Sequence, residues 1–220
     1  MSDKYPSTPY LEFAPGNNDF TIESKLFLHK RIVITEKIDG SNVCIHHKEC
    51  YARTHSSAPK HPSFDAFKAL HANLLCTHPK LLNVFTHLFG EWCYAKHSIS
   101  YDALPNYLVL FGVRMDGSWW SWEGVERFAK ALDIPTVPVL YQGVVASEAE
   151  LEQLVNQLRQ GPSECGAPEK EGVVVRLASS FLDNDFSQSV AKWVRPGHVQ
   201  DNEHWKHKEI IRNKLRENKT

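Results

Sequence analysis

The sequence lacks the features that place a protein in a membrane or in an oxidising compartment. No apolar run approaches the roughly 20 residues that a transmembrane helix needs. The amino terminus shows no signal-peptide pattern, and the five cysteines, an odd number, fit reduced thiols better than a disulfide framework. We therefore expect a soluble, cytoplasmic protein without a membrane partner.

Two further absences limit the functional classes. The 25 basic and 26 acidic residues give a formal net charge of −1, so the chain has no overall excess of positive charge for a polyanion. Any nucleic-acid surface must therefore be local. The twelve histidines are scattered and show no zinc-ligand spacing such as a paired CxxC or an HExxH. We interpret most of them as surface residues or hydrogen-bonded core residues.

The patterns that are present predict one α+β domain with antiparallel sheets and inserted helices. The chain has 220 residues, of which 42% are hydrophobic, enough to bury a full core. Strands and helices show no regular alternation, which favours antiparallel sheets over a parallel α/β sheet. We expect strands at 31–36, 43–47, 51–53, 89–94, 107–113, 172–177 and 190–194, and helices at 64–75, 79–87, 123–132 and 147–160.

The most informative stretch is Thr-Glu-Lys-Ile-Asp-Gly-Ser-Asn at 35–42, which follows an apolar β-branched run. It predicts a strand that carries Lys37 to the edge of a turn, and this turn would join the first two strands as an antiparallel pair. Lys37 and Asp39 would point one way and Glu36 the other. Partial burial or a nearby cation can turn a lysine into a nucleophile. Covalent catalysis by Lys37 and a surface strand that ends in a charged turn both fit this stretch alone.

Charged residues also interrupt three later strands that are otherwise apolar. Glu91 lies within Phe-Gly-Glu-Trp, Glu171 precedes a run of three valines, and Lys192 lies within Val-Ala-Lys-Trp-Val, with Arg195 just beyond. Each of them could face water at the edge of a strand. A charge inside an apolar strand is costly to bury without a partner, so the four together indicate a shared site.

Together these motifs resemble those of the covalent nucleotidyltransferases, the superfamily of ATP-dependent DNA and RNA ligases and mRNA capping enzymes. Residues 36–42 resemble motif I, 89–92 motif III, 108–111 motif IIIa, 171–174 motif IV and 191–195 motif V, in the family's order. The position of Asn42, five residues after Lys37, is similar to that of an asparagine in RNA ligases of the RNA ligase 2 type, and the chain resembles this branch most. The resemblance implies an ATP-grasp-like adenylation domain.

The resemblance also implies a reaction and a set of roles. Lys37 would attack the α-phosphorus of ATP, release pyrophosphate and hold AMP through a phosphoramide bond, as a lysyl-AMP intermediate. The AMP would pass to an RNA 5′-phosphate, and a 3′-hydroxyl would displace it. The implied nucleotide contacts are Glu36 and Asp39, Arg53 at the ribose or phosphate end, Glu91 at a ribose hydroxyl, Phe111 on the adenine face, and Lys192 and Arg195 at the α-phosphate. Glu171 would hold Mg²⁺ or Mn²⁺, and Asn42 would act on the RNA end.

Motifs IIIa and V depart from the family pattern. Gly112 follows motif IIIa where an acidic residue is common, and motif V lacks a second lysine two residues after Lys192. On a regular strand Lys192 and Arg195 face opposite sides, so Arg195 reaches the phosphate only if the strand bends or ends, which Pro196-Gly197 allows.

The C-terminal end is shorter than in related ligases. Only about 25 residues follow motif V, which leaves no room for the OB-fold domain of DNA ligases. We expect a nucleotidyltransferase domain over 1–200, with an irregular lead-in over 1–30. A basic helix over 201–218, within a C-terminal segment 201–220, would either dock on this domain or contact RNA phosphates.

The resulting hypothesis is an ATP-dependent RNA ligase that joins RNA ends in RNA repair, and an accessory protein could supply a missing nucleic-acid-binding domain. A nick-sealing DNA ligase and a guanylyltransferase are disfavoured, because the residues after motif V leave no room for the OB-fold domain expected of these enzymes. A non-catalytic nucleotide-binding subunit of a repair complex is disfavoured because Lys37, Glu91, Glu171 and Lys192 are all present.

Overall fold

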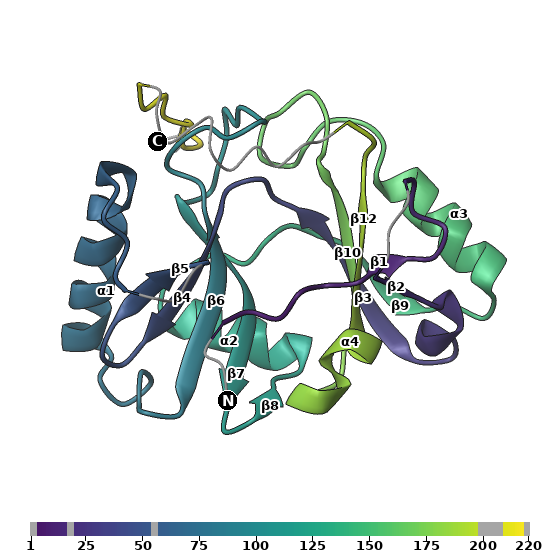
Figure 1. Cartoon of the computed structure of the whole chain (residues 1–220), viewed down its shortest axis with the longest axis horizontal. Helices are drawn as coiled ribbons and strands as arrows, with labels where there is room; N and C mark the ends of the chain where they lie inside the picture. The colour runs from purple at the N-terminus through teal and green to yellow at the C-terminus, as the bar shows by residue number, and fades with distance from the viewer. Residues whose placement is uncertain (1–3, 17–19, 54–56, 198–208, 218–220) are drawn as a thin grey trace.

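The β-branched and aromatic runs of the sequence pair into two six-stranded sheets, which form the two halves of the molecule (Figure 1). The structure, a computed structural model, describes residues 4–16, 20–53, 57–197 and 209–217. The first sheet, in the order β2-β1-β12-β10-β3-β9, contains β1 (Tyr10–Leu11), β2 (Thr21–Ile22), β3 (Arg31–Lys37), β9 (Val139–Val144), β10 (Gly172–Leu177) and β12 (Val190–Val194). The second, in the order β11-β8-β7-β6-β4-β5, contains β4 (Ser41–His46), β5 (Cys50–Ala52), β6 (Thr86–Trp92), β7 (Leu108–Met115), β8 (Ser118–Trp119) and β11 (Phe181–Leu182).

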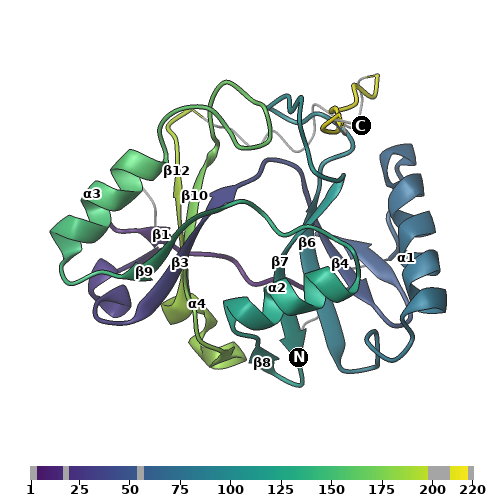
Figure 2. The same ribbon diagram turned by 180° about the vertical axis from the view of Figure 1, so that it is seen from behind.

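The helices pack against these sheets and complete two of the hydrophobic cores. α1 (Asp65–Thr77) and α2 (Trp122–Ala131) belong to the core of the second sheet, and Figure 2 shows α2 lying against β7. α3 (Glu148–Leu158) covers the first sheet. A one-turn helix, α4 (Phe186–Ser189), leads into β12, and short 3-10 helices span Ser24–Phe27, Pro62–Phe64 and Asp183–Asp185. In the described part of the chain, no helix is long and apolar enough to cross a membrane.

The structure confirms an α+β arrangement rich in antiparallel pairs. Every pair of neighbouring strands is antiparallel except those that β1 makes with β2 and β12. The expected helices at 123–132 and 147–160 are present with slightly different ends. The Ser147 hydroxyl caps α3 by accepting a hydrogen bond from the backbone N–H of Glu150.

The expected hairpin between the first two strands is wrong. β3 pairs with β9 and β10 in the first sheet, whereas β4 pairs with β5 and β6 in the second. The residues between β3 and β4 therefore cross from one sheet to the other (Figure 1). We refer to residues 38–40 as the crossover. The turn signal of Asp39-Gly40 is real, but it connects two sheets instead of two paired strands.

Two expected helices are also wrong. Residues 79–85 form turns, and β6 begins at Thr86, because this β-branched residue is buried and pairs with Met115 of β7. The C-terminal helix expected at 201–218 lies partly outside the described residues, and 209–217 contain no helix. This C-terminal segment makes isolated bridges from Arg212 to Ala95 and from Leu215 to Leu104.

Candidate active site

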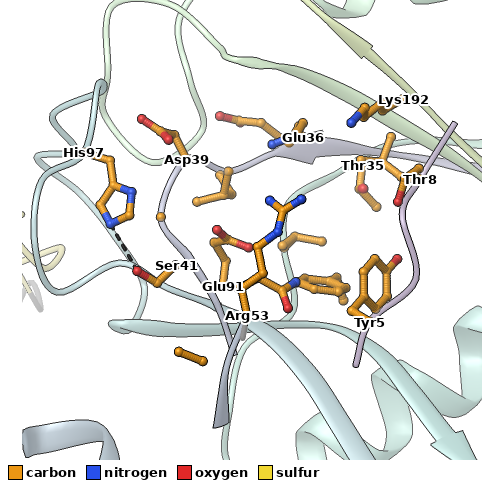
Figure 3. Close-up of a pocket in the computed structure, with 18 of the residues that line it drawn as sticks. Tyr5, Thr8, Thr35, Glu36, Asp39, Ser41, Arg53, Glu91, His97 and Lys192 are labelled. Carbon is orange, nitrogen blue, oxygen red and sulfur yellow. Dashed lines mark hydrogen bonds between the residues drawn. The ribbon is translucent and has the colours of Figure 1, made fainter. Parts of the chain in front are cut away.

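A cavity of about 1030 Å³ lies between the two sheets and contains most of the residues singled out in the sequence. Its walls come from β3, β10 and β12 on one side, from β4, β6 and β7 on the other, and from the crossover between them. Residues 4–8 add a further wall, and several of these side chains are drawn in Figure 3. The fold thus gathers residues that lie more than 100 positions apart in the sequence.

Lys37 and Glu171 form an ion pair beside this cavity. Lys37 ends β3 opposite Gly172 of β10, and its Nζ lies 2.6 Å from Oε1 of Glu171. The Lys37 side chain exposes 18% of its surface and the Glu171 side chain exposes none. Burial acts to lower the pKa of Lys37, but the charges of Glu171, Glu91 and Asp39 outweigh burial and raise it. The amine is therefore an ammonium group in the ligand-free protein.

Close strand packing next to this pair explains why Gly172 follows Glu171. A Cβ atom on Gly172 would lie 2.0 Å from the carbonyl oxygen of Trp193 in β12. No side chain fits there, so only glycine lets β10 and β12 approach at the end of the sheet that carries Lys37.

Glu91 reaches the cavity from β6, opposite Asn42 of β4, which also lines it. Burial raises the pKa of Glu91 to about 8 and the charges of Glu171 and Asp39 add to this, while Lys37 and the Gly40 backbone N–H oppose it. The carboxyl group is therefore mainly protonated at neutral pH. It can donate as well as accept a hydrogen bond in this state.

The carboxylates of Asp39 and Glu36 lie in the cavity wall and bind backbone groups of the protein. Oδ2 of Asp39 accepts hydrogen bonds from the backbone N–H groups of Ser98 and Ile99, each at 2.8 Å. Oε2 of Glu36 accepts one from the Glu164 N–H at 3.0 Å, and burial raises the Glu36 pKa. Both side chains therefore hold the surrounding loops in place.

Lys192 and Arg53 provide positive charge along the cavity. Lys192 Nζ lies 4.2 Å from the centre of the Tyr10 ring. Burial lowers the pKa of Lys192 to about 8, and the charges of Lys37 and Arg53 add to this, with Glu171 opposing them. In Figure 3 the Arg53 guanidinium projects into the middle of the cavity.

The structure does not bring Arg195 to this cluster. Arg195 lies outside the cavity lining and forms an ion pair with Glu169, while its backbone N–H donates to the Glu171 carbonyl oxygen. The strand does not bend enough to turn this side chain toward Lys192.

Aromatic rings close one part of the cavity. Phe111 of β7 lines it, and the Tyr5 ring packs edge-on against Phe111 with ring centres 5.0 Å apart. Tyr5 also packs against Phe89, Trp119 and Phe186, and burial raises its pKa to about 12. The sequence analysis did not identify Tyr5, because an isolated tyrosine in an irregular lead-in forms no periodic pattern.

His97 is a second cavity residue that the sequence analysis missed. Its Nε2 lies 3.2 Å from Oγ of Ser41, at the start of β4 (Figure 3). Burial lowers the pKa of His97, and the charges of Asp39 and Glu171 oppose this. Its position six residues after Glu91, in the loop that follows β6, is the only signal in the sequence.

Metal binding by side chains alone is not supported by this arrangement. Among the described residues, no group of three or more His, Cys, Asp or Glu side chains could hold a metal ion. Glu171 contributes one buried carboxylate next to Lys37. A cation here would therefore need further oxygen ligands from a bound molecule.

Comparisons with known proteins agree with these observations. Residues 30–194 match the model of the RNA ligase family. No curated protein sequence matches the chain. Among solved structures, a variant of Naegleria gruberi RNA ligase with ATP and manganese has a TM-score of 0.56 at 16% identity, covering 77% of this chain and 51% of that chain.

Two further structures of the Naegleria gruberi protein show a similar likeness. The one with PPi has a TM-score of 0.56 at 15% identity and covers 82% of this chain and 54% of that one. A variant with AMP and manganese has a TM-score of 0.54 at 16% identity, and the match covers 75% of this chain and 49% of that one. At these identities the likeness shows the fold alone, and the chain spans about half the length of the structures that it matches.

Proposed function

Because the chain belongs to the RNA ligase family, we propose that it is an ATP-dependent RNA ligase that works through a lysyl-AMP intermediate on Lys37. It would join 5′-phosphate and 3′-hydroxyl RNA ends, as RNA repair requires. The observation that supports this most is the placement of Lys37 beside buried Glu171, in a cavity that also receives Glu91 and Lys192. An amine next to a polar, cation-lined cavity is what adenylyl transfer needs.

In the first step the neutral amine of Lys37 attacks the α-phosphorus of ATP. A bond forms between Nζ and the α-phosphorus, the bond from that phosphorus to the oxygen bridging to the β-phosphorus breaks, and pyrophosphate leaves with the electron pair. Lys37 must lose its protons to bind phosphorus covalently, and the high pKa in the ligand-free protein opposes this. Binding of the nucleotide must therefore change the charge around Lys37.

Glu171 is the residue that would hold a divalent cation. Since Glu171 is a single carboxylate, phosphate oxygens of the nucleotide would complete the ligand set of Mg²⁺ or Mn²⁺. When bound, this cation would offset the phosphate charge and favour the neutral amine. The presence of ATP and manganese in a structure of the Naegleria gruberi RNA ligase supports ATP and a divalent cation as the molecules bound here.

The other cavity residues would orient the nucleotide. Phe111 would stack on adenine, Glu91 would hydrogen-bond to a ribose hydroxyl, and Lys192 and Arg53 would bind phosphate oxygens. Glu36 and Asp39 would contribute through the backbone positions that their side chains fix. We do not assign a phosphate contact to Arg195, because it pairs with Glu169 outside the cavity.

In the later steps the AMP moves to the RNA. An oxygen of the RNA 5′-phosphate attacks the adenylyl phosphorus, and the amine of Lys37 leaves. The 3′-hydroxyl then attacks the 5′-phosphorus, forms the new phosphodiester bond and releases AMP. Asn42 lines the cavity beside Glu91 and would contact this RNA end.

Two assays on the purified chain test this proposal. Incubation with ATP and Mg²⁺ or Mn²⁺ should add one adenylyl group to the intact mass of the wild type and of Lys25→Ala, but not of Lys37→Ala. Ligation is then compared on single-stranded RNA, nicked duplex RNA and nicked DNA with 5′-phosphate ends. Joining of RNA supports the assignment, whereas joining of nicked DNA alone would replace it with a DNA ligase.

A further inference from the structure

The C-terminal segment is attached to the loop that follows β6 by backbone hydrogen bonds and by one buried side chain, that of Asn213. Asn213 exposes 2% of its surface. Its amide nitrogen donates to the carbonyl oxygen of Cys93 at 2.8 Å, and its amide oxygen accepts from the backbone N–H of Tyr101 at 2.9 Å. The Asn213 backbone N–H also donates to the carbonyl oxygen of Tyr94. One residue thus joins both ends of the 93–101 loop.

The same loop holds the crossover that follows Lys37. The backbone N–H groups of Ser98 and Ile99 donate to Oδ2 of Asp39, and the Tyr101 hydroxyl accepts from the Asp39 backbone N–H at 2.8 Å. The Tyr101 side chain is fully buried. These three hydrogen bonds to Asp39 all come from the loop that Asn213 ties together.

Close packing leaves the crossover little freedom to adjust. A Cβ atom at Gly40 would lie 2.8 Å from the Trp92 carbonyl oxygen and 3.1 Å from Sγ of Cys93. On one side of the crossover is Lys37 in the first sheet, and on the other is the strand pair that carries Glu91 in the second. A shift of Asp39 would therefore change how Lys37 and Glu91 lie relative to each other.

We propose that Asn213 is a positioning residue for the Lys37 nucleophile and acts through Tyr101 and Asp39. This inference rests on the proposed adenylyl transfer at Lys37. Residues 93–107 contain no helix and no strand, so their backbone polar groups need partners from elsewhere, and Asn213 provides several of them. The C-terminal segment therefore takes part in building the active site, and its residues 209–211 also line the cavity.

Two variants separate positioning from simple stabilisation. Asn213→Ala removes the side-chain link between segment and loop. Tyr101→Phe keeps the buried ring and removes only the acceptor for the Asp39 N–H. Lys214→Ala is the matched control, because Lys214 is the next residue, its side chain is 76% exposed, and its backbone hydrogen bonds to Tyr101 and Leu104 stay.

The measurement is the rate of AMP attachment to the full chain at increasing ATP, well below the unfolding midpoint of each variant. We expect Asn213→Ala and Tyr101→Phe each to lower the maximal rate about tenfold while the half-saturating ATP concentration changes less than about threefold, because orientation is lost and the nucleotide contacts remain. The double variant should be less than about twofold slower than the slower single variant, since both act on Asp39. Lys214→Ala should match the wild type.

Three outcomes would overturn the inference. A normal maximal rate in folded Tyr101→Phe would show that the Asp39 contact does not position Lys37. Multiplicative losses in the double variant would show that Asn213 and Tyr101 act separately. If the wild type attaches no AMP at all, the proposed function itself is wrong. If the wild type is active and the variants are equally active, only the positioning role of Asn213 is wrong.

Discussion

Replacement of Lys37 by methionine should weaken the fold as well as remove the nucleophile. The ammonium group of Lys37 is 2.6 Å from a carboxylate that has no exposed surface. Breaking a buried ion pair by removing one partner costs about 3–5 kcal/mol, because the remaining charge stays buried. Lys37 is partly exposed and borders the cavity, so we expect a cost at or just below the lower limit of this range, about 2–3 kcal/mol. In a chain of this size that corresponds to a fall in Tm of roughly 5–10 °C.

A second substitution and a surface control make this expectation specific. Glu171→Gln in the Lys37→Met background removes the uncompensated charge and should recover most of the lost stability in urea unfolding. Lys25→Met breaks an exposed pair with Glu23 and should leave stability unchanged. If Lys37→Met is as stable as Lys25→Met, or if the double variant is no more stable than Lys37→Met, the buried pair does not have the energetic role argued above.

Three more predictions concern the other cavity residues. The pKa of Glu91 lies near 8 instead of its ordinary 4.5, so the folded state keeps a proton that the unfolded state has released, and the free energy of unfolding falls as pH rises between these values. Glu91→Gln should reduce this fall by up to about 1 kcal/mol per pH unit, measured by urea unfolding at pH 6 to 8. The same pH dependence of stability in wild type and variant would contradict the raised pKa of Glu91. Lys192→Ala should slow AMP attachment at least about 100-fold and Arg195→Ala less than about threefold, because only Lys192 lines the cavity; equal losses would place Arg195 in the site. Phe111→Leu should raise the half-saturating ATP concentration about fivefold to tenfold in the same assay through lost stacking, and an unchanged value would exclude Phe111 as the base-stacking residue.

The strand patterns and the spacing of charged residues were sufficient to predict the α+β class and several of the charged residues that meet in the cavity. Lys37, Glu91 and Lys192 each follow or interrupt an apolar strand, and a charge in such a strand is visible in the sequence without knowledge of its partner. Which strands pair is decided by contacts between distant residues. The hairpin expected around Asp39 fails because the partners of this side chain, Ser98 and Ile99, lie about 60 positions away.

Contacts between distant residues also explain why the C-terminal segment does not form the expected helix. Its apolar residues recur near helical spacing, which predicts a helix, but Asn213 makes its hydrogen bonds with backbone groups more than 100 positions earlier, and residues 209–217 contain no helix. Tyr5 and His97 enter the cavity from irregular segments, where no periodic pattern marks a residue as buried. Arg195 is the opposite case, since the motif resemblance suggested a phosphate contact, whereas its side chain pairs with Glu169 outside the cavity lining.

The central claim is that the amine of Lys37 accepts the adenylyl group, and peptide mapping of the ATP-treated protein by mass spectrometry tests it most directly. We expect one AMP per chain, located on the peptide that contains Lys37 and discharged when pyrophosphate is added. An adenylyl group on any other residue, or no modification with ATP and either Mg²⁺ or Mn²⁺, would contradict it.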